Sequence, residues 1–338
     1  MRKPFLSSVI LCLSAVVLFS LPVHAKPKDI TDSITYLDSI KKDNVILAND
    51  SLDKILNNIK ETSSGNIREQ LNTYLEEKDL SNTECSQIFW HSDKIAVSEE
   101  DAKTLENNAI TEKTSDFTPE VIQKDINEFV KTQSNGQVPL LIPDRYMNKK
   151  ESIYLSLGTW KQPWKNGFDM TRNTIEPFGK TGVENIMMHS RESIYLENEK
   201  ATGFMKEYED GSYFVGILPK EEKEELLVGD LDVESLLASK KEESVNVSLP
   251  KMNLSWSGGL VDVLTKSGLD KTFNTEETSL GKVYSVAVVN SIHFEEGAYH
   301  QQENDIALRS VSLNRPFAFL IIKDDNVLFS GKVTSMSK

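Results

Sequence analysis

The carboxyl-terminal stretch of this chain constrains the fold more than any other segment. Two apolar runs rich in β-branched and aromatic residues, Val283–Phe294 and Phe317–Ile322, flank a polar stretch over residues 295–312. A third apolar run, Val327–Val333, follows the turn sequence Lys-Asp-Asp-Asn. Apolar runs of strand length that are separated by polar and turn residues predict a strand, an exposed loop, a strand, a turn and a last strand. The chain is therefore expected to end in sheet structure interrupted by one long loop.

Three short motifs in this stretch resemble, in order and at about the right spacing, the carboxyl terminus of the serpin family. In serpins a strand ending in Glu-x-Gly leads into an exposed reactive loop. The chain returns through Asn-(Arg/Lys)-Pro-Phe and ends in a strand with the pattern Leu-Phe-x-Gly-(Arg/Lys)-Val. The matching residues here are Glu295-Glu296-Gly297, Asn314-Arg315-Pro316-Phe317 and Leu328-Phe329-Ser330-Gly331-Lys332-Val333.

The resemblance implies an α+β fold in a single serpin-like domain over residues 26–338. Such a domain has a large mixed β-sheet with packed helices, a smaller β-sandwich region and an exposed reactive loop, here about residues 295–312. Apolar residues at helical spacing between Thr31 and Leu80 agree with the expected helices. A further helix start is marked at Thr118, an N-cap residue followed by proline and glutamate.

Other positions resemble the part of a serpin into which the reactive loop inserts. Gly158-Thr159-Trp160 is similar to the Gly-x-Trp that ends a serpin strand, with the tryptophan under the insertion point. The stretch Asn44–Leu52 is similar to the entry of a buried helix. Ser51 and Ser152 align with a buried polar cluster where strands part, and Ala287 stands where a histidine is usual. The resemblance therefore assigns Trp160, Ser51 and Ser152 to the loop-insertion region.

The first 25 residues have the pattern of a secretory signal peptide. Arg2 and Lys3 form a basic start, Val9–Leu21 an apolar core, and Val23-His24-Ala25 a small-residue cleavage site. The apolar run is too short to span a membrane comfortably. We therefore expect a secreted protein, periplasmic or extracellular, with no membrane attachment after the signal is removed.

Charge and cysteine content restrict the partners and the means of stabilisation. Without Arg2 and Lys3 the formal net charge changes from −14 to −16. A surface that acidic repels phosphate backbones, so a nucleic-acid partner is not expected. Cys85 is the single cysteine after residue 25, so packing rather than an internal disulfide must stabilise the fold. We expect a monomer.

The sequence lacks the common patterns of catalytic and metal sites. Ser257 is followed by two glycines but lacks the glycine spacing of a nucleophile elbow. Gly179-Lys180-Thr181 lacks the upstream glycine of a phosphate-binding loop. The histidines after residue 25 have no second ligand at metal-binding spacing. We therefore expect no enzyme activity, no catalytic residues, no metal and no cofactor.

The resemblance implies a serine protease inhibitor that presents its reactive loop as bait. The protease cleaves the loop, and the freed loop inserts as a new strand of the large sheet. The loop hinge would be Glu295, Glu296, Gly297 and Ala298. The bond Arg309-Ser310 suits a trypsin-like protease, whereas family spacing from the hinge favours a bond near Val311-Ser312, so the cleavage-site candidates are Arg309, Ser310, Val311 and Ser312.

A second interpretation is a non-inhibitory serpin that acts as a binding or structural module for another protein, or a plain protease substrate. Serpin hinges that insert fast have a run of alanines, whereas one strand phase of this loop would bury His300, Gln302 and Asn304. Each would cost about 1–3 kcal/mol if it were buried without a hydrogen-bond partner. The loop is also short, because only Leu313 separates Ser312 from the returning Asn314.

Overall fold

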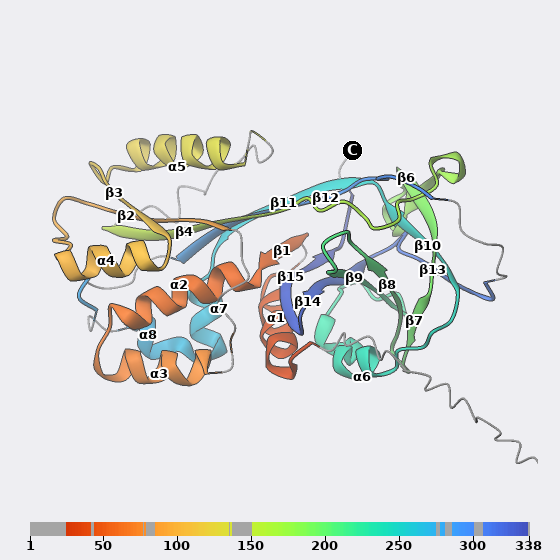
Figure 1. The fold of residues 1–338 in the computed structure, drawn as a ribbon, viewed down its shortest axis with the longest axis horizontal. Helices are drawn as coiled ribbons and strands as arrows, with labels where there is room; N and C mark the ends of the chain where they lie inside the picture. Colours follow the sequence, from red (N-terminus) through yellow and green to blue (C-terminus); the bar gives the residue numbers. More distant parts are fainter. Residues whose placement is uncertain are drawn as a thin grey trace, which may run out of the picture.

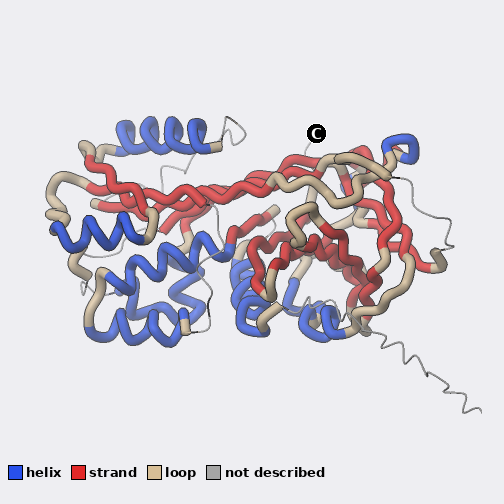
Figure 2. Tube along the Cα trace, viewed as in Figure 1, coloured by secondary structure: helices blue, strands red, loops and turns tan. Residues whose placement is uncertain are grey.

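The structure is a computed structural model that describes residues 25–41, 44–76, 78, 85–134, 136, 151–274, 278–280, 286–300 and 307–336. Apart from Ala25, the predicted signal peptide lies outside the described residues. In the described part of the chain, the strands form three sheets of five, six and four strands, here called the long, central and outer sheets. Figures 1 and 2 show the long sheet running across the molecule, with helices at one end and the other two sheets at the opposite end.

The long sheet has the strand order β11-β12-β4-β2-β3 and is mixed. Its two central strands, β12 and β4, pair in parallel, and so do β2 and β3, whereas the other neighbours are antiparallel. The strands are β2 (Cys85–His91), β3 (Ile110–Thr114), β4 (Ser152–Trp160), β11 (Met252–Gly259) and β12 (Val286–Phe294). This is the large mixed sheet that the sequence predicted.

Helices cover both faces of the long sheet. On one face lies α5 (Pro119–Gln133), whose side chains Ile122, Ile126 and Val130 pack on β2, β4 and β12. Thr118 is its N-cap, as predicted, and accepts a hydrogen bond from Val121 N. The opposite face lies over a group of smaller helices: α1 (Pro27–Ser39), α2 (Asn49–Glu61), α3 (Gly65–Leu75), α4 (Glu99–Asn107), α7 (Val261–Leu264), η5 (Thr265–Leu269) and α8 (Asp270–Asn274).

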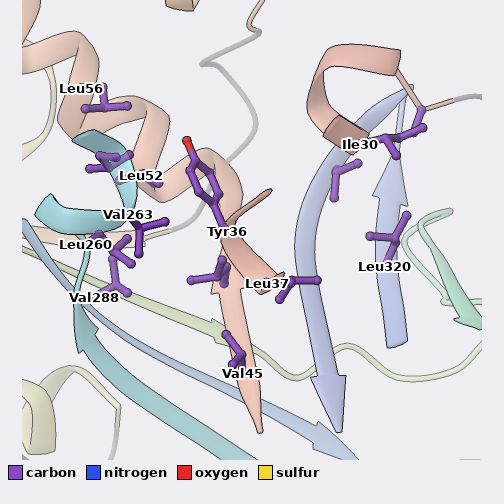
Figure 3. Close-up of a cluster of buried hydrophobic side chains, with 14 of the residues drawn as sticks. Ile30, Tyr36, Leu37, Val45, Leu52, Leu56, Leu260, Val263, Val288 and Leu320 are labelled. Carbon is purple, nitrogen blue, oxygen red and sulfur yellow. The ribbon is translucent and has the colours of Figure 1, made fainter. Parts of the chain in front are cut away.

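The largest apolar cluster joins these smaller helices to the long and central sheets. Figure 3 shows Tyr36 and Leu37 of α1, Leu52 and Leu56 of α2, and Val288 of β12 converging in it. All five side chains are almost fully buried. Burial of this apolar surface supplies most of the free energy that holds the helices to the sheets.

The central and outer sheets pack on each other as a β-sandwich, also as predicted. The central sheet has the order β1-β15-β14-β9-β8-β7 and the outer sheet β13-β10-β6-β5. Central-sheet strands are β1 (Val45–Ala48), β7 (Ile194–Glu197), β8 (Ala201–Glu207), β9 (Tyr213–Pro219), β14 (Phe317–Lys323) and β15 (Asn326–Val333). Outer-sheet strands are β5 (Thr174–Phe178), β6 (Val183–Glu192), β10 (Val245–Pro250) and β13 (Arg309–Ser312). Short helices in this half are η2 (Met170–Arg172), η3 (Gly179–Thr181), η4 (Val228–Leu231) and α6 (Val233–Ala238).

The predicted loop over residues 295–312 is too long at its carboxyl end. The last four of these residues form β13, which pairs in parallel with β10. The chain between β12 and β13 is therefore residues 295–308, of which 301–306 lie outside the described residues. A polar, short strand of this kind has no apolar periodicity, so its partner, not its own sequence, makes it a strand.

Candidate functional site

The candidate site is the segment that follows β12, because it links the long sheet to the outer sheet. Residues Glu295–His300, here called the hinge segment, lie against residues Trp164–Phe168, here called the strap, which follow β4. The predicted hinge residues all belong to the hinge segment. Neither segment is a strand, yet the two exchange hydrogen bonds along their length.

Backbone-to-backbone hydrogen bonds form the middle of this contact. Gly167 N donates to Ala298 O at 2.6 Å, and Phe168 N donates to Glu296 O at 2.7 Å. A Cβ atom on Gly167 would lie 2.4 Å from Glu296 O, so no larger residue fits here without displacing the hinge segment. Gly297, with φ of +70°, supplies the left-handed turn that brings the chain onto the strap.

Side chains of the strap hold the two ends of the hinge segment. At its start, the indole Nε1 of Trp164 donates to Glu295 O at 2.8 Å, and the indole itself stacks on Tyr208 with 4.1 Å between ring centroids. At its end, the Asn166 side chain bonds the backbone of His300 twice, accepting from His300 N at 2.8 Å and donating to His300 O at 3.2 Å. The hinge segment is thus fixed outside the long sheet.

Glu296 adds an ionic contact to the outer sheet. Its buried carboxylate accepts from Lys251 Nζ at 2.7 Å and from Asn173 Nδ2 at 3.2 Å. Burial alone would raise the pKa of this carboxyl group, but the hydrogen bond and positive charge of Lys251, with Asn173, hold the pKa of Glu296 below its usual value. Glu296 is therefore ionised at neutral pH. Its ion pair with Lys251, the residue between β10 and β11, links the hinge segment to the outer sheet.

The predicted cleavage-site residues lie at the other end of the loop, in β13. In the parallel pairing of β13 with β10, Arg309 lies opposite Val245 and Ser312 opposite Ser248. Arg309 and Ser310 are exposed, whereas Val311 is 2% exposed and packs in the core of the β-sandwich. A protease needs an extended segment on both sides of the cleaved bond, so β13 must leave β10 before a bond here can enter a protease cleft.

In the long sheet, β12 and β4 are direct neighbours. These strands pair directly in parallel, from Val286 opposite Tyr154 to Ile292 opposite Trp160. Trp160 ends β4 on the side of the strap, where its ring contacts Tyr208 and Phe329 with centroid distances of 5.4 and 5.5 Å. Trp160 is the last residue of its strand, and its assignment to the loop-insertion region stays a prediction.

Of the residues assigned to the loop-insertion region, Trp160 and Ser152 lie at opposite ends of β4, and the assignment itself stays a prediction. Ser152 begins β4 and pairs with His91, eight residues from Trp160, or about 26 Å along an extended strand. The serine that shares a polar contact with Ser51 is Ser156. Gln87 Nε2 bridges the two, donating to Ser51 O at 2.5 Å and lying 3.5 Å from Ser156 Oγ.

Asn290 was not singled out from the sequence, yet it lies at the seam between β12 and β4. It is fully buried, and its Nδ2 donates to Ile46 O at 2.9 Å, which links β12 to the first strand of the central sheet. Asn290 pairs with Gly158, where a Cβ atom would lie 2.5 Å from Ala48 Cβ. The available signal was a lone amide inside an otherwise apolar run. Asn166 and Gly167 had no such signal, because the strap has no periodicity.

The return motif after β13 anchors the chain to the outer and central sheets. Asn314 O accepts from Gly179 N at 2.7 Å, and the Arg315 guanidinium donates to Pro219 O at 2.5 Å. Pro316, which has no backbone N–H to donate, comes directly before β14, and Phe317 is fully buried at the start of that strand. The motif thus separates β13 from β14.

The comparison with known families identifies the class of protein. The sequence profile of the family described as "Serpin (serine protease inhibitor)" matches residues 44–336, which is most of the chain. The chain belongs to the serpin family.

Within the described residues there is no group of three or more His, Cys, Asp or Glu side chains arranged to hold a metal ion, and no helix long and apolar enough to cross a membrane.

Individual relatives agree with this family. The chain is 26% identical over 247 residues to Serpin B10 of Sorex araneus, covering 63% of this chain and 62% of that protein. It is 27% identical over 264 residues to alpha-1-antiproteinase S of Cavia porcellus, covering 71% and 65%. Among solved structures, Serpin48 of the insect Tenebrio molitor superposes with a TM-score of 0.76 at 18% identity, covering 92% and 97%. That superposition confirms the fold. The match to Serpin B10 spans less than two thirds of that protein's length.

Proposed function

We propose that this serpin inhibits a serine protease by inserting its cleaved loop between β12 and β4. The direct parallel pairing of β12 with β4 carries this proposal. The loop follows β12, so on folding back it would run antiparallel to β12 and therefore also antiparallel to β4. One parallel ladder would be replaced by two antiparallel ladders, and antiparallel pairing is slightly more stable per residue. Insertion is thus favourable, while the intact loop is held outside by the strap at one end and β10 at the other.

The bait that the structure favours is Arg309. Its side chain is about half exposed, 3.8 Å from Glu243 and over the ring of Tyr195, and it can be presented once β13 leaves β10. The protease serine Oγ would attack the carbonyl carbon of Arg309. The peptide bond to Ser310 breaks, Ser310 leaves as a new amino terminus, and Arg309 remains as an ester on the protease. Insertion of the loop would then carry the protease with it before water hydrolyses the ester.

The test is a denaturing gel of residues 26–338 mixed with trypsin. We expect a covalent band at the summed mass of the protease and the serpin's amino-terminal fragment, together with a large rise in the melting temperature of the cleaved chain. The variant Arg309→Gln should lose the band, and Lys180→Gln, an exchange of a basic residue in η3 between β5 and β6, should keep it. Cleavage near Arg309 with neither band nor rise in melting temperature would leave the second interpretation, a non-inhibitory serpin or plain substrate.

We also propose that the protein is exported and acts as a monomer. The basic start and short apolar core of residues 1–25 support export. The outcome to check is a mature amino terminus at Lys26 in protein recovered outside the cytoplasm, and a single monomeric peak in gel filtration. A chain that begins at Met1 in that fraction would contradict the signal-peptide part.

A further inference from the structure

We propose that Asn166 is a positioning residue that holds the hinge segment outside the long sheet and sets how fast the hinge segment is released. This inference rests on the proposed insertion of the loop. It assigns to a side chain of the strap a role that the hinge sequence alone does not reveal.

The Asn166 side chain makes the same two hydrogen bonds to the backbone of His300 that a neighbouring strand would make. Its carboxamide accepts from His300 N at 2.8 Å and donates to His300 O at 3.2 Å, so one side chain satisfies both backbone groups of one residue. A residue whose N–H and C=O are both occupied has none left on that side for β4 or β12. His300 therefore cannot join the long sheet until its two hydrogen bonds with the Asn166 side chain are broken.

Asn166 acts at the end of the contact that lies farthest from β12 along the chain. The bonds of Trp164, Phe168 and Gly167 to the hinge segment lie nearer to β12. His300 is the last described residue of the hinge segment, and its contact is the only one made in both directions by a strap side chain, among the residues described. Opening that begins at the loop side must break the Asn166 contact first, and opening that begins at β12 must break it last.

The buried side chain of Lys206 holds the backbone of Asn166 in place. Lys206 Nζ donates to Asn166 O at 2.7 Å and to Glu192 Oε1 at 2.7 Å. The Lys206 side chain is 2% exposed, and its ammonium lies 4.4 Å from the centroid of the Phe168 ring. Because Lys206 and Glu192 belong to β8 and β6, the Asn166 backbone is fixed to both the central and the outer sheet. The side chain that meets His300 is therefore presented from a rigid support.

The first test measures release in the intact chain. Backbone hydrogen exchange at His300, whose N–H donates to Asn166, and at Gly167 and Phe168, whose N–H groups donate to carbonyls of the hinge segment, should be about tenfold faster in Asn166→Ala than in the wild type, because two hydrogen bonds of ordinary net strength are lost. Asn166→Asp, which keeps the acceptor for His300 N but not the donor, should fall between the two. Asn198→Ala is the matched control, since that side chain also donates to loop carbonyls, of Leu231 and Asp232, far from the hinge segment.

The second test measures insertion after the loop is cut. The melting temperature of trypsin-cleaved protein is followed with time, and its rise should be about tenfold faster in Asn166→Ala, with Asn198→Ala like the wild type. Equal hydrogen exchange in Asn166→Ala and wild type, or equal insertion rates in chains that do insert, would overturn the role of Asn166. If no chain gains stability after cleavage, the proposed inhibition fails, while hydrogen exchange still decides whether Asn166 holds the hinge segment.

Discussion

The two ends of the segment proposed as a reactive loop are attached to the molecule in different ways. The amino-terminal end, the hinge segment, is held by scattered bonds to the strap and by the carboxylate of Glu296. The carboxyl-terminal end is a strand, β13, in register with β10 and with Val311 in the core. Polar contacts at a surface contribute little net free energy each, whereas a buried apolar side chain contributes about 1.5–3 kcal/mol. The hinge segment is therefore expected to detach more easily than β13.

The difference has a consequence for the proposed inhibition. Loop insertion needs only the hinge segment to move, and that is the weakly held end. Presentation of Arg309 to a protease needs β13 to move, and that is the strongly held end. The slow step is thus expected to be binding of the protease rather than insertion, unless the strap delays the hinge segment as proposed for Asn166.

The largest expected effect comes from breaking the carboxyl-terminal end with Val311→Asp. Burying a carboxylate where Val311 now packs should lower the free energy of unfolding by about 3 kcal/mol or detach β13 altogether. Urea unfolding measures the loss, and trypsin cleavage at Arg309 should become faster at the same time. Ser310→Asp on the exposed neighbouring position should change stability by no more than about 0.5 kcal/mol. Equal stabilities for the two variants would show that β13 is not anchored by its buried side chain.

A smaller effect is expected at the amino-terminal end from Gly167→Ala. The new Cβ would lie 2.4 Å from Glu296 O and 2.6 Å from Ala298 O, so the hinge segment must move away from the strap. We expect faster hydrogen exchange of the backbone N–H groups at positions 167 and 168, which donate to the hinge segment, with a loss of about 1–2 kcal/mol in global stability. Unchanged exchange in this variant would mean that the two backbones do not lie as close as described.

Ser312→Ala probes the edge of β13 with a milder change. Ser248 Oγ donates to Ser312 Oγ at 2.6 Å across the β10–β13 pair, and this bond is partly buried. Its loss should lower the free energy of unfolding by about 1 kcal/mol. Thermal unfolding beside Ser310→Ala, which lacks this partner, measures the difference, and a Ser310→Ala loss as large as that of Ser312→Ala would contradict the assignment.

The smallest effect is a pH dependence confined to the hinge segment. The pKa of Glu296 is lowered in the folded chain, whereas a free glutamate has a pKa of about 4.3. The contact with Lys251 therefore contributes fully above about pH 4.3 and is lost as the pH falls through the lower folded value. After correction for the intrinsic exchange rate at each pH, hydrogen exchange at Gly167 and Phe168, whose N–H groups donate to the hinge segment, should rise below pH 4 by an amount equivalent to no more than about 1 kcal/mol. Glu296→Gln should remove this dependence, and an equal response at β13 would argue against it.

Much of this arrangement was predictable from short motifs. The strand before Glu295, the return at Asn314–Phe317 and the helix that begins after Thr118 are fixed by local patterns of turn, cap and apolar residues, and the structure has all three. The strand that ends at Trp160 was also predictable, because its Gly-x-Trp ending is distinctive. These features depend on residues that are close together in the sequence, so they can be read from local patterns.

The remaining features depend on partners far along the chain. Residues 309–312 became a strand because β10, more than sixty residues earlier, supplies the backbone groups. Gln87 bridges Ser51 and Ser156, because the register of β2 and β4 places Ser156 opposite Gln87. The strap was missed because Asn166 and Gly167 act through contacts with residues 296–300, and nothing in the local sequence indicates them.

Because β1 pairs with β15, the first strand of the central sheet is synthesised long before its partner. β1 lies at the edge of the central sheet and takes its only described strand partner from the last strand of the chain. Asn44, just before β1, donates to Ser335 O, 291 residues later. At a synthesis rate of roughly 5–20 residues per second, β1 waits about 15–60 s for that partner. During this time its backbone edge and the apolar side chains of Val45–Ala48 are open to other chains, so a truncated or stalled copy is a ready seed for aggregation.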